Sequence, residues 1–245
     1  MINSIEITTQ VGCPNSCEYC PQDVLKAAYG EKQRTLKWLD FIWCMNNIPA
    51  DTEICFAGFC EPWANNGVEN MIHLVASRGH EIIVNTTLAC KLSLNLIKDV
   101  PFKKFQVHLL PNSGNGYLEN VKHVIESNIK NLSFRAHMPI SSEIQRAIEG
   151  YNFDGKKTLL SRARNLKAQA RKAGGLAPCA QLGRHVLLPN GDVVLCCMDY
   201  GLKHKLGNLI EDDLEVIRKG NEFQKVLKGF EDDTIDTICR YCEKS

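Results

Sequence analysis

The sequence lacks the marks of membrane, secreted and nucleic-acid-binding proteins. No run of about 18 apolar residues is present to cross a bilayer. The N-terminus has no basic start followed by an apolar stretch, which a signal peptide would have. The 29 basic and 28 acidic residues leave a net charge of +1, so no charge excess favours nucleic acid or an anionic membrane. These absences predict a cytoplasmic protein that binds neither.

Low-complexity tracts and the composition of disordered chains are also missing. The chain has 245 residues, 44% hydrophobic and 23% charged, which is typical of a globular protein with a sizeable core. The unusual feature is the presence of 12 cysteines. Because disulfides are rare in a reducing cytoplasm, clustered cysteines there indicate metal binding or catalysis.

Strand and helix patterns alternate through the first 150 residues. Strand patterns occupy residues 4–9, 52–57, 81–86, 104–109 and 132–137, and helical patterns occupy 35–47, 66–78, 92–100, 117–127 and 142–149. A sixth strand is expected near 157–161. Such alternation predicts an α/β fold with a parallel sheet and outer helices. Six units would make an incomplete (β/α)6 TIM-like barrel, with its sites at the carboxyl ends of the strands.

The alternation of strand and helix patterns ends after residue 165, and we place a domain boundary there. Residues 1–165 are expected to form the partial barrel, and residues 166–245 a small cysteine-rich C-terminal unit. Asn190-Gly191 stands between two apolar runs within 184–195, which is a strong hairpin signal. Residues 211–230 have a helical pattern. The second unit is therefore predicted to be a hairpin plus a helix.

Three cysteines follow the first expected strand with the spacing C-x3-C-x2-C: Cys13, Cys17 and Cys20. Three thiolates from one loop can hold three irons of a cubane cluster and leave the fourth iron open. A zinc site completed from elsewhere stays open as an alternative, because soft thiolates suit both metals. A loop with incidental cysteines is the other alternative.

This motif, with Tyr19 as the aromatic residue before the last cysteine, resembles the signature of the radical S-adenosylmethionine (SAM) superfamily. The resemblance implies that Cys13, Cys17 and Cys20 bind a 4Fe–4S cluster whose fourth iron takes the amino and carboxylate groups of SAM. Tyr19 would lie near the adenine. One electron, from a flavodoxin- or ferredoxin-type donor, would cleave SAM to methionine and a 5′-deoxyadenosyl radical, which would abstract a substrate hydrogen.

A second segment that fits this family follows the second expected strand. Residues 57–62, Ala-Gly-Phe-Cys-Glu-Pro, look like the Gly-Gly-Glu-Pro loop of the family. The resemblance implies that Gly58 and Glu61 receive the SAM amino group. The sequence departs from the family at Cys60, which stands where a second glycine is usual.

Two further positions follow from the same resemblance. Asn85 and Thr86, at the end of the third expected strand, are similar to the segment that lies near the SAM ribose. Arg162, within Ser-Arg-Ala-Arg-Asn at 161–165, would face SAM or the substrate. His108 and His137 lie at strand ends where they could face the barrel mouth, although a structural role is the favoured interpretation for either of them.

Later cysteines form a second set: Cys179, Cys196, Cys239 and Cys242. The hairpin turn would return Cys196 toward Cys179, and the C-x2-C pair of the tail would complete four thiolates. By ligand chemistry, zinc and a 4Fe–4S cluster suit such a set equally. Cys197 adjoins Cys196 and is the alternative ligand, although the four-residue spacing from Gly191 favours Cys196.

The spacing of this set resembles the SPASM/Twitch extension of radical SAM enzymes, whose cysteines hold auxiliary 4Fe–4S clusters. Only three residues follow Cys242, so the resemblance implies the Twitch form with one fully ligated auxiliary cluster. In size and layout the chain is similar to the aminocyclitol dehydrogenases of this subgroup. The cofactors that the resemblance implies are two 4Fe–4S clusters, one of which binds SAM, and SAM itself.

The function that we expect is the oxidation of a small, sugar- or cyclitol-like molecule, with the auxiliary cluster as electron acceptor. The catalytic base stays unassigned, and we expect a monomer. One alternative is a radical SAM enzyme that matures ribosomal peptides. It is less favoured because the first strand begins near residue 4, with no peptide-binding domain before it. Another alternative is a non-enzymatic zinc-thiolate binding module.

Overall fold

The computed structural model describes residues 2–15, 17–111, 115–155 and 160–245. The strands are β1 (Ser4–Ile7), β2 (Glu53–Phe56), β3 (Ile82–Thr86), β4 (Phe102–Leu109), β5 (Leu132–Ala136), β6 (Asn152–Asp154), β7 (Arg184–Leu187), β8 (Asp192–Val194) and β9 (Lys205–Asn208). The helices are α1 (Gln22–Tyr29), α2 (Trp38–Asn46), α3 (Val68–Ser77), α4 (Leu94–Ile97), α5 (Asn115–Glu126), α6 (Ser142–Ala147), α7 (Leu214–Lys219) and α8 (Asn221–Glu231). Short 3-10 helices, η1 (Pro62–Ala64) and η2 (Ile238–Tyr241), complete the described elements.

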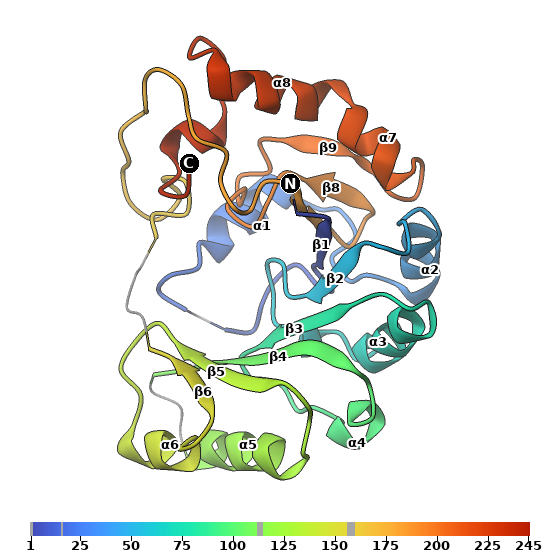
Figure 1. The fold of residues 1–245 in the computed structure, drawn as a ribbon, viewed down its shortest axis with the longest axis vertical. Coiled ribbons are helices and arrows are strands. Elements are labelled where there is room, and N and C mark those ends of the chain that lie inside the picture. The colour runs from blue at the N-terminus through green and yellow to red at the C-terminus, as the bar shows by residue number, and fades with distance from the viewer. Residues whose placement is uncertain (1, 16, 112–114, 156–159) are drawn as a thin grey trace.

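One sheet of nine strands runs through the chain in the order β6-β5-β4-β3-β2-β1-β7-β8-β9. Neighbouring strands from β6 to β7 are parallel, and β8 and β9 are added antiparallel. Figure 1 shows this sheet curving from β6 at the bottom to β9 near the top, with α2 to α6 along its outer side. Since β6 and β9 end the order, the sheet is not closed. The predicted α/β class and incomplete barrel are confirmed.

The core explains why the helices lie on the outer side. Along β1 and β2, Ile5, Ile7, Ile54 and Phe56 are fully buried. Helix α3 buries Val68, Met71, Ile72 and Val75, the spacing of an apolar helix face. The opposite face of the same sheet carries polar side chains, among them Glu6, Asn85 and Gln106, which line a cavity. The sheet therefore has a dry outer face and a polar inner face.

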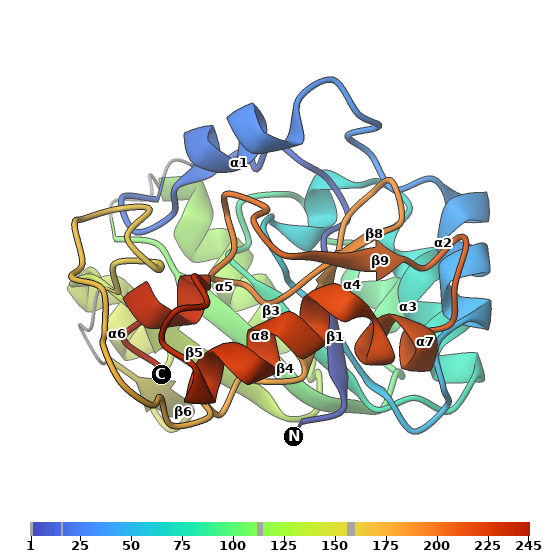
Figure 2. The ribbon, with the colours of Figure 1, turned by 90° about the horizontal axis from the view of Figure 1, so that it is seen from above.

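A smaller apolar cluster seats α1 against the C-terminal strands. Leu25 and Tyr29 of α1 are buried together with Val186, Val194 and Tyr200. Figure 2 shows β8 and β9 between α1 and α8. The sequence patterns missed both α1 and β9. Strand β7 pairs with β1, so the sheet continues past the boundary that we expect at residue 165, and that boundary stays a prediction.

The hairpin predicted at 184–195 is confirmed as β7 and β8. Gly191 has φ of +86°, and a Cβ there would lie 2.5 Å from Oδ1 of Asn208, so glycine suits the turn. The helical pattern at 211–230 is two helices, α7 and α8, which meet at Gly220. The helix expected at 92–100 is the shorter α4.

The sixth strand of the described sheet lies before the residues at which we expect it. Strand β6 lies at Asn152–Asp154, and residues 157–159 of the expected strand fall outside the described residues. Among the helices that the structure describes, none has the length and apolar character needed to cross a membrane.

Candidate functional site

A cavity of about 400 Å³ opens at the carboxyl ends of the parallel strands. Its lining includes every residue predicted for the first cluster and for SAM: Cys13, Cys17, Tyr19, Cys20, Gly58, Glu61, Asn85, Thr86 and Arg162. These residues come from the loops after β1 and β2, from β3 and from the segment before β7. The structure therefore brings the first set of predicted site residues to one place.

The first cysteine set lies in the loop between β1 and α1. The Sγ atom of Cys13 accepts a hydrogen bond from the backbone N–H of Glu61 at 3.3 Å. Burial raises the pKa of Cys13 to about 11 and raises the pKa of Cys17, and the nearby Cys20 thiol raises both further. Without a metal these thiols stay protonated at neutral pH, so metal binding would release protons. As donors, three thiols from one loop fit an iron–sulfur cluster.

Gln22, the first residue of α1, orders this loop. Its Nε2 donates to the carbonyl of Phe59 at 2.7 Å and to Sγ of Cys20 at 3.2 Å. Its Oε1 accepts from the backbone N–H of Cys13 at 3.4 Å. One buried amide thus ties two of the cysteines to the loop after β2. Sequence reasoning missed Gln22 because it missed the helix that begins there.

The loop after β2 packs directly on the end of β1. Gly58 has φ of +62°, and a Cβ at this position would lie 2.2 Å from Oγ1 of Thr8. The same Oγ1 accepts a hydrogen bond from the backbone N–H of Phe59 at 3.1 Å. Gly58 is therefore required for the close approach of the two segments.

Glu61 is almost fully buried, and burial raises its pKa. It accepts hydrogen bonds from Oγ1 of Thr86 at 2.7 Å, from both N and Oγ1 of Thr87 at 2.6 Å, and from the backbone N–H of Trp63 at 3.4 Å. A carboxylate has about four acceptor positions, so the chain fills them. Glu61 clamps the end of β3 to the loop after β2, and a SAM ammonium group would have to share its oxygens with these donors.

Thr87 was not among the predicted residues, although it links three parts of the site. Its Oγ1 accepts from Nδ2 of Asn15 in the cysteine loop at 2.7 Å while it donates to Glu61. Asn85, two residues earlier, donates to Sγ of Cys55 at 3.4 Å. The end of β3 is therefore held between both loops.

Aromatic and basic side chains form the opposite wall. The rings of Tyr19 and His137 lie 4.8 Å apart, and those of His137 and His108 lie 5.5 Å apart. Arg162 donates from Nε to the backbone carbonyl of Tyr19 at 3.3 Å. Burial and neighbouring cations, Arg135 among them, lower the pKa of His108 to about 3. His108 and His137 line the cavity, and the His108 imidazole is neutral at neutral pH.

The second cysteine set comes from distant segments of the chain. Cys239 interacts electrostatically with Cys179 and Cys242, and Cys196 interacts with Cys239. Burial raises the pKa of Cys239 to about 12. Within the described part of the chain, no three Cys, His, Asp or Glu side chains converge as a site for a single metal ion would require. As donors, four thiols suit a fully ligated cluster.

The adjacent residues Cys196 and Cys197 lie in different surroundings. The Cys196 thiol has Cys239 among its neighbours. Cys197 lines the cavity, and a hydrogen bond links it to the buried carboxyl group of Glu6. The structure therefore associates Cys196 with the second set and Cys197 with the cavity wall.

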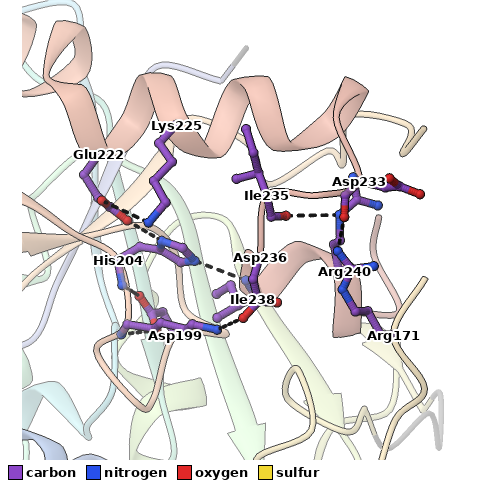
Figure 3. A network of polar contacts seen from close by, with 11 residues as sticks. Arg171, Asp199, His204, Glu222, Lys225, Asp233, Ile235, Asp236, Ile238 and Arg240 are labelled. Atoms are coloured by element: carbon purple, nitrogen blue, oxygen red, sulfur yellow. Dashed lines mark hydrogen bonds and ion pairs between the residues drawn. The ribbon is translucent and has the colours of Figure 1, made fainter. Parts of the chain in front are cut away.

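His204, the residue before β9, helps to position the tail that carries Cys239. Its Nδ1 lies 2.7 Å from Oε1 of Glu222 in α8, and its Nε2 accepts from the backbone N–H of Ile238 at 3.1 Å. The backbone N–H of His204 donates to Asp199 at 2.8 Å. Figure 3 shows His204 between these partners. Since Nε2 is an acceptor, Nδ1 carries the proton and donates it to Glu222.

Arg240 stands between the two cysteines of the tail and is fully buried. Its guanidinium donates to four backbone carbonyls, those of Ile235, Gly229, Lys172 and Gly174, at 2.6 to 3.3 Å. Figure 3 shows its bond to Ile235. These bonds join η2 to α8 and to the segment before Cys179. Sequence reasoning did not single out Arg240, because its partners lie far away in the chain.

Comparison with known proteins agrees with this geometry. Residues 179–243 match SPASM, an iron–sulfur cluster-binding domain. This span begins at Cys179 and includes the whole second set. No curated protein matches the chain by sequence.

Several solved structures share the fold. The chain is similar to BtrN in complex with AdoMet (SAM) and 2-DOIA, with a TM-score of 0.74 and 15% identity over 99% of this chain and 93% of that one. It is also similar to anSMEcpe with bound AdoMet, with a TM-score of 0.58 and 13% identity over 94% and 81%. Streptococcus suis SuiB bound to precursor peptide SuiA gives a TM-score of 0.52 and 13% identity over 96% and 65%.

The resemblance to the radical SAM superfamily is confirmed for the fold and for the C-terminal domain. The number of clusters and the ligand roles of the individual cysteines stay predictions. The chain thus has the fold of the radical SAM enzymes of the SPASM/Twitch subgroup, and its residues 179–243 match the SPASM iron–sulfur cluster-binding domain.

Proposed function

We propose that the chain is a radical SAM oxidoreductase that removes two electrons from a small molecule. One observation carries this proposal: the cavity lined by the first cysteine set is also lined by Gln181, Met198 and Lys244, which lie within two residues of cysteines of the second set. The hydroxyl of Tyr200 lies 3.2 Å from Sγ of Cys20, and Tyr200 lies four residues after Cys196. A substrate in this cavity would lie between the two regions.

Each cysteine set has a separate role in this proposal. Cys13, Cys17 and Cys20 would hold a 4Fe–4S cluster with an open iron for SAM, and the second set would hold a fully ligated auxiliary cluster. When bound, these groups would supply one-electron chemistry: the first cluster would reduce SAM, and the auxiliary cluster would accept the electron that the substrate loses after hydrogen abstraction, with the proton passing to a base or to solvent.

The chain's own side chains would orient the reactants. The clamp between Glu61 and the end of β3 holds the loop that faces the cysteines. Tyr19, His137 and Arg162 form the wall across the cavity. The electron donor would be a protein of the flavodoxin or ferredoxin type, and the enzyme would act as a monomer.

Peptide modification is the second candidate. It is favoured by one observation, that the fold is similar to SuiB bound to the precursor peptide SuiA. A small molecule remains the better proposal because the cavity has a volume of only about 400 Å³. A peptide that co-purifies with the chain would reverse this preference.

The test is metal analysis combined with SAM cleavage. The protein is reconstituted without oxygen, and iron, sulfide, zinc and dithionite-dependent SAM cleavage are measured. About eight irons are expected in the wild type, and about four in Cys13→Ala/Cys17→Ala/Cys20→Ala and in Cys239→Ala/Cys242→Ala. Cleavage should be lost only in the triple variant. Cys90→Ala, outside both sets, is the matched control and should retain both clusters and cleavage.

Other outcomes would separate the alternatives. Four irons in the wild type and none in the triple variant would remove the auxiliary cluster and the oxidation with it. Stoichiometric zinc without SAM cleavage would leave the zinc-thiolate binding module.

A further inference from the structure

The part of the cavity deepest in the sheet is rich in basic side chains. Lys104 of β4, Arg135 of β5 and Arg184 of β7 all line it. Lys104 is level with Ile83 in the sheet register, whereas Asn85 is level with Gln106. Two residues along a strand span about 6.6 Å. Asn85 is the residue predicted to face SAM. Lys104 thus lies two residues, or about 6.6 Å, nearer the amino ends of the strands than Asn85.

Two of these three cations have a carboxylate partner within ion-pair distance. Arg135 is paired with Asp154 at 2.6 Å, and Arg184 with Glu53 at 2.9 Å. In the described ranges, Lys104 has no hydrogen bond or ion pair, and the buried Nε of Arg184 has no hydrogen-bond partner. An ammonium group and a guanidinium N–H therefore remain available in a half-buried cavity.

The surroundings of Lys104 are unfavourable to its charge. Burial and the neighbouring guanidinium of Arg135 lower the pKa of Lys104, and Arg184 lowers it further, against the opposing effect of Asp154. Glu6 is in electrostatic contact with Arg184 and Arg162 and hydrogen-bonds Cys197. Like charges that face one cavity are costly unless an anion lies between them.

We propose that this deep part of the cavity binds an oxyanion, a carboxylate or phosphate group of the substrate, with Lys104 as its principal ligand. An anion there would pair with the Lys104 ammonium and reduce the repulsion from Arg135 and Arg184. The identification of the anion as substrate rests on the proposed function, whereas anion binding itself does not. The proposed substrate class narrows from any small sugar- or cyclitol-like molecule to one that carries a carboxylate or phosphate group.

The test is anion binding by the reconstituted protein with saturating SAM and no reductant, so that no turnover occurs. Inorganic phosphate and succinate are titrated separately by calorimetry at constant ionic strength. The wild type should bind one of them, and the choice distinguishes a phosphate from a carboxylate substrate. Lys104→Gln should weaken binding about tenfold or more, and Lys104→Arg, which keeps the charge, should retain most of it.

Lys103→Gln is the matched control. Lys103 is the preceding residue of β4, and its Nζ contacts Glu53 and Glu81 at 2.9 and 2.7 Å. It does not line the cavity, so its loss should leave anion binding unchanged.

Three results would overturn the proposal: no binding of either anion by the wild type, equal binding by Lys104→Gln, or a loss of SAM affinity in Lys104→Gln, which would assign the lysine to SAM. SAM cleavage is measured on the same samples with dithionite. Cleavage without anion binding refutes the anion site alone. Anion binding without cleavage supports the site and refutes the radical function.

Discussion

The two cysteine sets are built in different ways. The first set comes from one loop, residues 13–20, and faces a cavity. The second set comes from residues 179, 196, 239 and 242, with Cys239 and Cys242 buried. Thiols of the first set are positioned by neighbours in contact with the loop, such as Gln22. Those of the second set depend on tertiary contacts between distant segments.

This difference indicates which substitutions should disrupt each cysteine set. A substitution near the loop should disturb the first set and leave the second intact. A substitution at the buried joints of the tail should do the reverse. The predictions below test this independence and the burial of the cavity between the two regions, beginning with the change that should have the largest effect.

Arg240→Met should remove the second cluster and spare the first. The change leaves four buried carbonyls without their guanidinium donor, which should cost on the order of 3 kcal/mol or more. Iron content should fall by about half, with SAM cleavage retained. Denaturant unfolding and iron analysis measure the two effects.

Arg171→Met is the control for this prediction. Arg171 lies in the same region (Figure 3), is exposed and bonds only the carbonyl of Asp233 in the described structure. Its loss should change stability by less than about 0.5 kcal/mol. If Arg240→Met lost the iron of both sets, the two regions would not be independent.

Glu6→Gln should change the pH dependence of stability. Burial raises the pKa of Glu6 from 4.5 to about 7. Glu6 is protonated in both states below about pH 4.5, so its contribution to stability is complete there and is lost as pH rises through about 7. Because glutamine stays neutral at every pH, the free energy of unfolding of the wild type should fall by up to about 3 kcal/mol more than that of the variant between pH 4.5 and 8.

Unfolding of the metal-free protein at pH 5 and pH 8 measures this loss. The variant should show the smaller decrease between the two values. The exposed Glu211→Gln is the control and should match the wild type at both. Parallel curves for wild type and Glu6→Gln would show that Glu6 ionises normally. The cavity beside Cys197 would then be wetter than the structure indicates.

Gly58→Ala should affect the first region only. Its Cβ would lie 2.2 Å from Oγ1 of Thr8 and 3.0 Å from the Thr8 backbone N, at a positive φ, which should cost about 1–3 kcal/mol. SAM affinity should fall while the iron of the second set is retained.

Gly30→Ala separates strain from contact. Gly30 also has a positive φ, +68°, but a Cβ there would meet nothing within 4 Å. It should show only the backbone cost of about 1 kcal/mol and normal SAM affinity. Equal effects of the two variants would show that the contact with Thr8 is unimportant.

The sequence predicted what depends on local spacing. The C-x3-C-x2-C loop and the Asn190-Gly191 hairpin each lie within a few residues, so a pattern identifies them. Strand β6 was misplaced because it has only three residues, and two of them are exposed. Helix α1 was missed because its eight residues follow Pro21 without a side-chain cap.

The site was predictable as a list of motif residues but not as a set of contacts. Gln22, Thr87 and Tyr200 act through partners that only the fold brings close. The choice between Cys196 and Cys197 as a ligand of the second set also depends on contacts that only the fold reveals. Two neighbouring residues after a strand point to opposite surroundings, and the sequence spacing favoured the first without showing what the second contacts.

Tyr200→Phe should have the smallest effect and the most specific one. The hydroxyl of Tyr200 joins the C-terminal region to the first cysteine set. It lies 3.2 Å from Sγ of Cys20, within hydrogen-bond distance. A metal-bound thiolate has no proton, so the hydroxyl must donate. Phenylalanine keeps the packing on Phe59, whose ring centroid is 4.7 Å away, and removes the hydrogen bond to Cys20.

This hydrogen bond should stabilise the reduced cluster more than the oxidised one. Losing about 1 kcal/mol of that preference would lower the reduction potential of the first cluster by roughly 40 mV. Redox titration followed by electron paramagnetic resonance should show this shift in the first cluster and none in the second. A shift in both would mean that the two regions are coupled through this hairpin.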